Sequence, residues 1–168
     1  MTGWRLRKIV SGGQAGVDRA ALDVALARRI PCGGWCPKGR LAEGGVIPDR
    51  YPLMETATAD VAERTRLNVR DSDVTLVMVN GASDKGTDHT LAVAAELGRP
   101  ALRIDLVLKP DPQAVNNWLG SVGASLVLNI AGPRESNAPG IQALAREYLR
   151  WLLADVALDD DLHELPGL

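Results

Sequence analysis

Short apolar segments alternate with longer amphipathic segments along most of this chain. Val74–Val79 is a run of β-branched and other apolar residues, which is typical of a buried strand. Arg5–Val10, Cys32–Cys36, Ala101–Ile104 and Leu126–Ile130 are the other short segments that we interpret as strands. The chain is therefore expected to build a sheet of several short strands.

The segments between these strands have helical character. The last one shows the clearest pattern, because Ile141, Leu144, Tyr148 and Leu152 fall on one stripe at 3.6-residue spacing. Further helices are expected at about 17–29, 60–70, 88–97 and 112–119. Pro31 and Pro100 follow the first and third of these segments, as expected after helix ends.

Regular alternation of strands and helices predicts an α/β fold. Right-handed crossovers then give a Rossmann-like, doubly wound, mainly parallel sheet flanked by helices, in three layers α/β/α. The chain shows no repeat and no linker, so we expect one ligand-binding domain at 1–154 and an acidic tail at 155–168 that frays. Ligands of such sheets bind outside the carboxyl ends of the strands.

Composition and charge exclude several classes of protein. The net charge is −2, and the tail holds five acidic residues, which leaves 19 basic and 16 acidic residues elsewhere. This balance does not indicate a nucleic-acid or membrane partner. Two cysteines are too few for a disulfide framework or a closed zinc site, and no signal peptide or membrane span is recognisable. We therefore expect a cytoplasmic protein, and we assign no set of metal ligands.

The first candidate site is the glycine-rich loop between the first strand and the first helix. Its candidate ligand-binding residues are Ser11, Gly12, Gly13, Gln14 and Gly16. Glycines let backbone amides approach a phosphate, and the following helix start adds unpaired N–H groups. No acidic residue for a ribose follows at the usual distance, and no Walker-type Gly-Lys-Ser/Thr occurs. The alternative interpretation is a tight turn without a ligand.

Two further polar loops follow later strands. In the loop after Val79, Gly86, Thr87 and Thr90 are candidates for binding an oxyanion, although Asp84 or Thr87 would serve equally as a helix N-cap. The loop after the last strand offers Gly132 and also Arg134 and Ser136 as phosphate ligands. The alternative for Arg134 is a surface ion pair.

The segment 37–58 has no clear period and holds three Pro and three Gly, which predicts a long functional or mobile loop. At its start, Trp35 is a candidate for stacking on a flat ring, and Lys38 and Arg40 are candidates for binding anions. The alternatives are a core tryptophan and solvated cations. Cys36 fits either a ligand for a soft metal or a small buried residue.

In this order, the segments resemble the molybdenum cofactor carrier family. That family belongs to a Rossmann-like superfamily with lysine-decarboxylase-like proteins and cytokinin-activating phosphoribohydrolases. The resemblance extends from about Ile9 to Leu153 and is carried by Ile9–Asp23, Gly33–Arg40, Ile47-Pro48, Tyr51–Leu53, Glu55-Thr56, Arg64-Thr65, Asn68-Val69, Asp71–Asp73, Ala131–Ser136 and Pro139–Ile141. It implies a carrier with molybdenum cofactor (molybdopterin) or a related nucleotide-like phosphate compound as its cargo.

The middle loop departs from the pattern of these relatives. Lys85 occupies the first position of the Gly-Gly pair that the family usually carries, and Thr90 stands where the phosphoribohydrolases have a glutamate. The resemblance therefore implies binding without the hydrolysis that those relatives perform.

Two other functions remain open at this point. A nucleotide-processing N-glycosidic hydrolase would use Asp18, Arg64 and Glu135 for acid–base chemistry or charge stabilisation, although Asp18 also suits the positive start of a helix. A nucleotide-signal sensor would share the carrier's site and change its partner or oligomeric state. A homodimer or homotetramer is compatible with the sequence.

Overall fold

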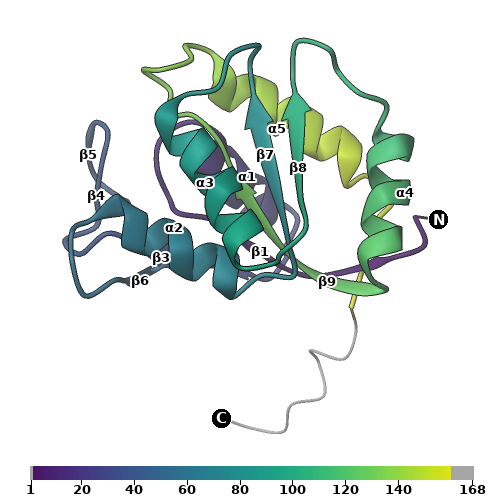
Figure 1. The fold of residues 1–168 in the computed structure, drawn as a ribbon, viewed down its shortest axis with the longest axis horizontal. Helices are drawn as coiled ribbons and strands as arrows, with labels where there is room; N and C mark the ends of the chain where they lie inside the picture. Colours follow the sequence, from purple (N-terminus) through teal and green to yellow (C-terminus); the bar gives the residue numbers. More distant parts are fainter. Residues whose placement is uncertain (1, 160–168) are drawn as a thin grey trace, which may run out of the picture.

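A parallel sheet forms the centre of the molecule in the computed structural model, which describes residues 2–159 (Figure 1). Its strands are β1 (Arg5–Val10), β2 (Cys32–Gly33), β7 (Val74–Val79), β8 (Ala101–Asp105), β9 (Ser125–Ala131) and β10 (Ala157–Leu158). They lie in the order β10-β1-β9-β7-β8, with β2 also paired to β1, and every pair is parallel. The predicted α/β fold with a mainly parallel sheet is confirmed.

Helices cover both faces of this sheet. They are α1 (Val17–Ala27), α2 (Val61–Arg70), α3 (Lys85–Glu96), α4 (Pro112–Val122) and α5 (Ile141–Leu152). α1 and α5 pack together behind the sheet in Figure 1, and their buried aliphatic residues join those of β1, β7 and β9 in the main core. α2 and α3 pack together in front, around the buried Val69, Val93 and Ala94. These are the three predicted layers.

Aspartates set the start of three helices. Asp60, Asp84 and Asp111 each accept a hydrogen bond from a main-chain N–H in the first turn of α2, α3 and α4. The cap at Asp84 makes α3 begin at Lys85, three residues before the predicted start at 88. Asp84 is therefore the N-cap residue of α3, and Thr87 is not.

The predicted strand Cys32–Cys36 is in fact two strands in different sheets. β2 pairs with β1, whereas β3 (Trp35–Cys36) pairs with β6 (Met54–Glu55). Gly34 lies between them at φ +131°, and a Cβ there would meet the Ser11 carbonyl oxygen at 2.3 Å. The chain turns at this glycine because only glycine fits the close approach.

The segment 37–58 contains short strands and is not the predicted irregular loop. Besides β6 it forms a small antiparallel hairpin of β4 (Leu41–Ala42) and β5 (Gly45–Val46). The Arg40 guanidinium donates hydrogen bonds of 2.9–3.3 Å to four carbonyl oxygens, those of Ile47, Pro48, Tyr51 and Leu53. Arg40 thus holds the segment in one internal conformation through these four hydrogen bonds.

The beginning of the acidic tail also belongs to the sheet. Ala157 and Leu158 form β10 beside Arg5 and Leu6 of β1. The expectation that this segment frays is therefore wrong for these residues. Residues 160–168, which include His163, lie outside the described part of the chain.

Glycine substitutions test how tightly the carboxyl ends of the strands pack. A Cβ at Gly132 would lie 2.3 Å from the Met78 carbonyl oxygen and 2.6 Å from Val17 Cγ2, so the backbone has to shift. We expect Gly132→Ala to destabilise the protein by about 1–3 kcal/mol, as overpacking of cores does. A Cβ at Gly86 would have Asp84 Oδ1 as its near neighbour at 3.7 Å, so Gly86→Ala is expected to leave stability unchanged or to raise it by up to about 1 kcal/mol.

Thermal unfolding of the two variants beside the parent protein measures this difference. Equal melting temperatures for Gly132→Ala and Gly86→Ala would contradict the close packing described above.

Candidate functional site

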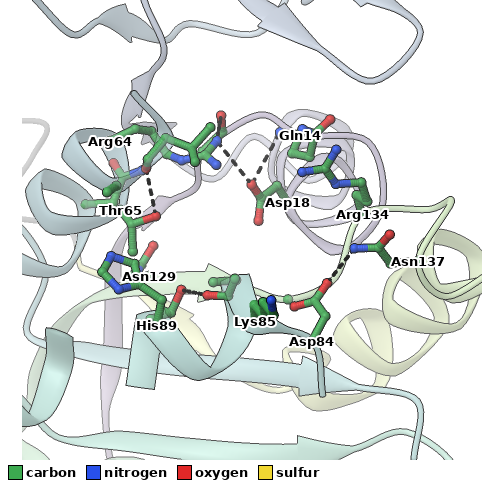
Figure 2. Close-up of a pocket in the computed structure, with 18 residues that line it drawn as sticks. Gln14, Asp18, Arg64, Thr65, Asp84, Lys85, His89, Asn129, Arg134 and Asn137 are labelled. Carbon is green, nitrogen blue, oxygen red and sulfur yellow. Dashed lines mark hydrogen bonds and ion pairs between the residues drawn. The ribbon is translucent and has the colours of Figure 1, made fainter. Parts of the chain in front are cut away.

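The three predicted polar loops meet around one cavity of about 560 Å³ (Figure 2). It opens where β1, β7 and β9 end, with the first turn of α3 on one side and α2 on the other. Among the predicted ligand-binding residues, six line the cavity: Gly12, Gln14, Gly86, Thr90, Gly132 and Arg134. Asp18 and Arg64, named for the enzymatic alternative, line it as well.

Asp18 places a buried carboxylate in the wall of this cavity. It lies in the first turn of α1 and is 7% exposed. Its Oδ2 accepts a hydrogen bond of 3.3 Å from the Gln14 amide and lies 3.9 Å from Arg64 Nη1. Burial raises the pKa of Asp18 to about 6, since the charge of Arg64, the Gln14 amide and the charge of Arg19 lower it only in part.

Arg64 reaches the same point from α2. Its Nη1 donates to the Gly12 carbonyl oxygen at 3.0 Å. A Cβ at Gly12 would lie 2.6 Å from Arg64 Nη1 and 2.9 Å from Asp18 Oδ2. Glycine at position 12 therefore leaves room for the carboxylate and the guanidinium to lie next to each other beside the main chain.

The opposite wall is the first turn of α3. Asp84 accepts hydrogen bonds from the Thr87 amide at 2.8 Å and from Asn137 Nδ2 at 2.9 Å. Burial raises the pKa of Asp84, but the hydrogen bonds from Asn137 and Thr87 and the charge of Arg134 lower it further, so the net pKa lies below its usual value. Asp84 is thus an ionised, well-satisfied cap that orders this wall.

Two cations that line the cavity, Lys85 in this wall and Arg134 in the loop after β9, have no hydrogen-bonded partner for their side chains among the described residues. Within residues 2–159, the side chains of Lys85 and Arg134 make no hydrogen bond or salt bridge to another residue. The Lys85 and Gly86 amides, in the first turn of α3, likewise donate to no other described residue. Lys85, Gly86 and Arg134 therefore offer unused donors and positive charge to the cavity.

The first glycine loop already satisfies most of its own amides. The donors and acceptors are Gln14 N to Asp18 Oδ2, Ala15 N to Gln14 Oε1, Gly16 N to Gln142 Oε1 and Val17 N to Pro133 O. The start of α1 thus has few amides left for a phosphate, unlike the start of α3.

A family model described as the circularly permutated YpsA SLOG family matches residues 9–153. The chain belongs to this SLOG family.

Among solved structures, the chain is similar to a protein of Syntrophus aciditrophicus SB described as a "putative molybdenum carrier protein". The two share 44% sequence identity with a TM-score of 0.84, over 88% of this chain and 95% of the other. A curated relative, the NAD(P)H-hydrate epimerase of Microbacterium testaceum (strain StLB037), is 36% identical over 72 residues, or 43% of this chain. The match spans 28% of the epimerase, so that enzyme's activity does not transfer to this chain.

Several predicted site residues of this SLOG-family chain lie away from the cavity. Ser11 is fully buried, and its hydroxyl donates to the Asp18 carbonyl oxygen at 2.8 Å. A Cβ at Gly13 would meet Leu53 at 2.4 Å, and one at Gly16 would meet the Pro133 carbonyl oxygen at 2.4 Å. These three residues therefore pack the loop, and they do not line the cavity.

The predicted ring-binding group is also elsewhere. Trp35 is half-buried and donates from Nε1 to Asp71 Oδ2 at 2.9 Å, and Lys38 is exposed outside the cavity. The four carbonyl contacts of Arg40 occupy its guanidinium within its own segment.

Cys36 packs in a buried cluster with Leu22, Ile47 and Tyr51, and burial raises the pKa of its thiol. Among the described residues, no group of three or more His, Cys, Asp or Glu is placed to hold a metal.

Three further candidate residues, in the second and third loops, do not line the cavity. Thr87 is buried in α3 at 2% exposure and does not line the cavity. Ser136 binds the Glu43 carboxylate through its hydroxyl and its amide. Glu135 accepts from the Gly140 amide at 2.6 Å and the Gln142 amide at 2.9 Å, so it caps the start of α5. The geometry does not support Glu135 as an acid–base residue.

Sequence reasoning missed several cavity residues. Asn68, Asn129, Asn137 and His89 all line the cavity, and His89 follows Lys85 by one turn of α3. The spacing of Lys85 and His89 was a usable signal, because residues four apart share a helix face. No local pattern marks the three asparagines, since they come together only through the fold.

In the described part of the chain, no helix is both long and apolar enough to cross a bilayer.

Asp18→Asn tests the buried carboxylate through the pH dependence of stability. The pKa of Asp18 rises from 3.8 to about 6 on folding. Below pH 3.8 the carboxyl is protonated in both states, and as the pH rises through about 6 the folded state loses up to about 3 kcal/mol of stability. The asparagine side chain of the variant does not ionise and still accepts from the Gln14 amide, so we expect a higher melting temperature above pH 7 and no gain near pH 4.

Asp84→Asn is the matched control, because the pKa of Asp84 is lowered. Its stabilising contribution is present at neutral pH and is lost as the pH falls through its folded pKa. The two variants are therefore expected to differ from the parent protein in opposite directions at pH 7. A gain for Asp18→Asn that did not vary with pH would contradict the assignment.

Proposed function

We propose that this protein binds a small phosphorylated ligand and holds the phosphate at the start of α3, between Lys85, Gly86 and Arg134. The observation that carries this proposal is the pair of unpartnered cations beside the free first-turn amides of a twelve-residue helix. Unpaired N–H groups and the positive end of the helix dipole both favour an anion at this position. Arginine and lysine bind phosphate through charge-assisted hydrogen bonds.

The charge balance of the cavity supports a phosphate monoester. Arg64 lies 3.9 Å from Asp18, and the ionised Asp84 is hydrogen-bonded as a helix cap, so Lys85 and Arg134 are the two cations of the cavity that form no salt bridge with a described residue. A phosphate monoester carries a charge of about −1.5 to −2 at pH 7, which matches two cations. A volume of about 560 Å³ also lies within the usual range of small-molecule sites.

Molybdenum cofactor is a candidate cargo for this site. It is a pterin with one phosphate and a metal-dithiolene group, and the structural neighbour from Syntrophus aciditrophicus SB is named as a molybdenum carrier. The cargo would be bound and released, with the chain's own residues supplying the phosphate contacts and the shape of the cavity. The ring would lie toward Asp18 and Arg64, because the phosphate occupies the opposite wall.

An N-glycosidic hydrolase is the second candidate function. One observation favours it: Asp18 is a buried carboxyl with a pKa near 6 in the wall of the cavity, beside Arg64. Such a group is able to exchange a proton near neutral pH. Thr90, at the position of the relatives' glutamate, donates its hydroxyl to the Gly86 carbonyl oxygen at 3.0 Å and supplies no carboxylate. Release of free base from nucleoside monophosphates would support hydrolysis, and intact nucleotides after long incubation would remove it.

Substitution of the two unpartnered cations tests the proposed phosphate site. We expect Lys85→Ala and Arg134→Ala each to weaken binding of guanosine monophosphate (GMP) about tenfold or more, because each removes charge-assisted hydrogen bonds. Lys38→Ala removes an exposed lysine outside the cavity and is the matched control. Isothermal titration calorimetry measures the affinities, and competition by inorganic phosphate isolates the phosphate contact.

Binding of GMP that is unaffected by Lys85→Ala and Arg134→Ala would place the phosphate elsewhere. If neither GMP nor inorganic phosphate binds the parent protein, the proposed function fails.

A further inference from the structure

The Asp18–Arg64 pair has hydrogen-bonding capacity that the protein itself does not use. A carboxylate offers about four lone-pair positions, and a guanidinium offers five N–H donors. Within residues 2–159, the Asp18 side chain accepts one hydrogen bond, from the Gln14 amide, and the Arg64 side chain donates one, to the Gly12 carbonyl oxygen. Both side chains line the cavity, at 10% and 13% exposure.

A purely structural role explains this pair poorly. The hydrogen bond to the Gln14 amide needs one acceptor oxygen, which the amide side chain of asparagine also offers. Burial disfavours the ionised carboxylate in this wall, so the charged form destabilises the folded protein at neutral pH. Residues that are unfavourable for stability and face a cavity are typical of binding sites.

The position of the Asp18–Arg64 pair relative to the phosphate site indicates which part of the ligand the pair would contact. Figure 2 shows Asp18 and Arg64 on the wall across the cavity from Lys85 and His89. A ligand with its phosphate at Lys85 would therefore present its other end to Asp18 and Arg64. Ionised Asp18 only accepts hydrogen bonds, and Arg64 only donates them.

We propose that Asp18 and Arg64 bind a ring edge that carries two adjacent N–H donors followed by a carbonyl oxygen, the 2-amino-4-oxopyrimidine edge shared by guanine and pterins. This inference rests on the proposed function, since the phosphate at Lys85 sets the direction of the ligand. Asp18 Oδ2 already accepts from the Gln14 amide, so the unused capacity of the carboxylate is at Oδ1 and at the remaining lone pair of Oδ2. Two neighbouring N–H donors form two parallel charge-assisted hydrogen bonds with these oxygens, whereas a single donor forms one. Arg64 then donates to the carbonyl oxygen beside them.

Three nucleotides that share a ribose phosphate but differ in this edge of the base show which of its groups the protein recognises. GMP has both donors and the carbonyl. Inosine monophosphate (IMP) keeps the ring N–H and the carbonyl but lacks the 2-amino donor, and adenosine monophosphate (AMP) lacks both donors and has an amino group in place of the carbonyl. Calorimetry at pH 7.5 is expected to give the order GMP, IMP, AMP from tight to weak, with GMP about tenfold tighter than IMP. In Asp18→Asn, GMP is expected to bind no tighter than IMP.

Lys85→Ala is the matched variant for the phosphate end, and it is expected to weaken all three nucleotides by the same factor. Retained binding of IMP by Asp18→Asn shows that this variant is folded. Competition between GMP and 6-(hydroxymethyl)pterin phosphate distinguishes the two sources of the edge, because the tighter ligand identifies a guanine or a pterin compound.

Equal affinities of the parent protein for GMP, IMP and AMP would overturn the inference and leave the proposed function standing. A preference for GMP that persists in Asp18→Asn would overturn it in the same way. If none of the phosphate compounds binds, the proposed function fails and the inference fails with it.

Discussion

The main chain after β9 passes so close to its neighbours that a single methyl group would not fit. A Cβ at Gly132 would lie 2.3 Å from the Met78 carbonyl oxygen at the end of β7, and one at Gly16 would lie 2.4 Å from the Pro133 carbonyl oxygen. These contacts bring the loops after β1, β7 and β9 together at the carboxyl edge of the parallel sheet. The cavity and the placement of Asp18, Lys85 and Arg134 depend on this close packing.

The two carboxylates of the cavity differ in their environments, and this difference organises the site. Asp84 has its hydrogen bonds satisfied by Thr87 and Asn137, so it orders the start of α3 and leaves the neighbouring cations available. Asp18 is buried with little compensation, and its pKa is raised. The carboxylate of Asp84 thus stabilises the start of α3, whereas the carboxylate of Asp18 retains lone pairs that can accept hydrogen bonds from a ligand.

Local pattern was sufficient to predict most of the framework. The strands at Arg5–Val10 and Val74–Val79 and the final helix were predicted from apolar runs and a 3.6-residue stripe, and the structure confirms them. The failures have long-range causes. The separation of β2 from β3 depends on contact between Gly34 and Ser11, and β10 is formed by pairing with β1, which lies at the other end of the chain.

The same distinction applies to the site. Glycine-rich loops at strand ends predicted where the cavity lies, and Gly12, Gly86, Gly132 and Arg134 do line it. Sequence alone did not show that the amides at the start of α1 are occupied by Asp18, Gln14 and Gln142, which leaves the start of α3 as the better anion site. Nor did it show that Arg40 binds four carbonyl oxygens of its own segment, because those oxygens come together only in the folded chain.

A crystal structure of the protein grown with GMP is the most direct test of a phosphate site at the start of α3, since it locates the phosphate without reference to affinity. We expect phosphate density within hydrogen-bonding distance of the Lys85 and Gly86 amides and the Arg134 guanidinium, with the base directed toward Asp18. Phosphate density at the start of α1 instead, against residues 12–16, would contradict it.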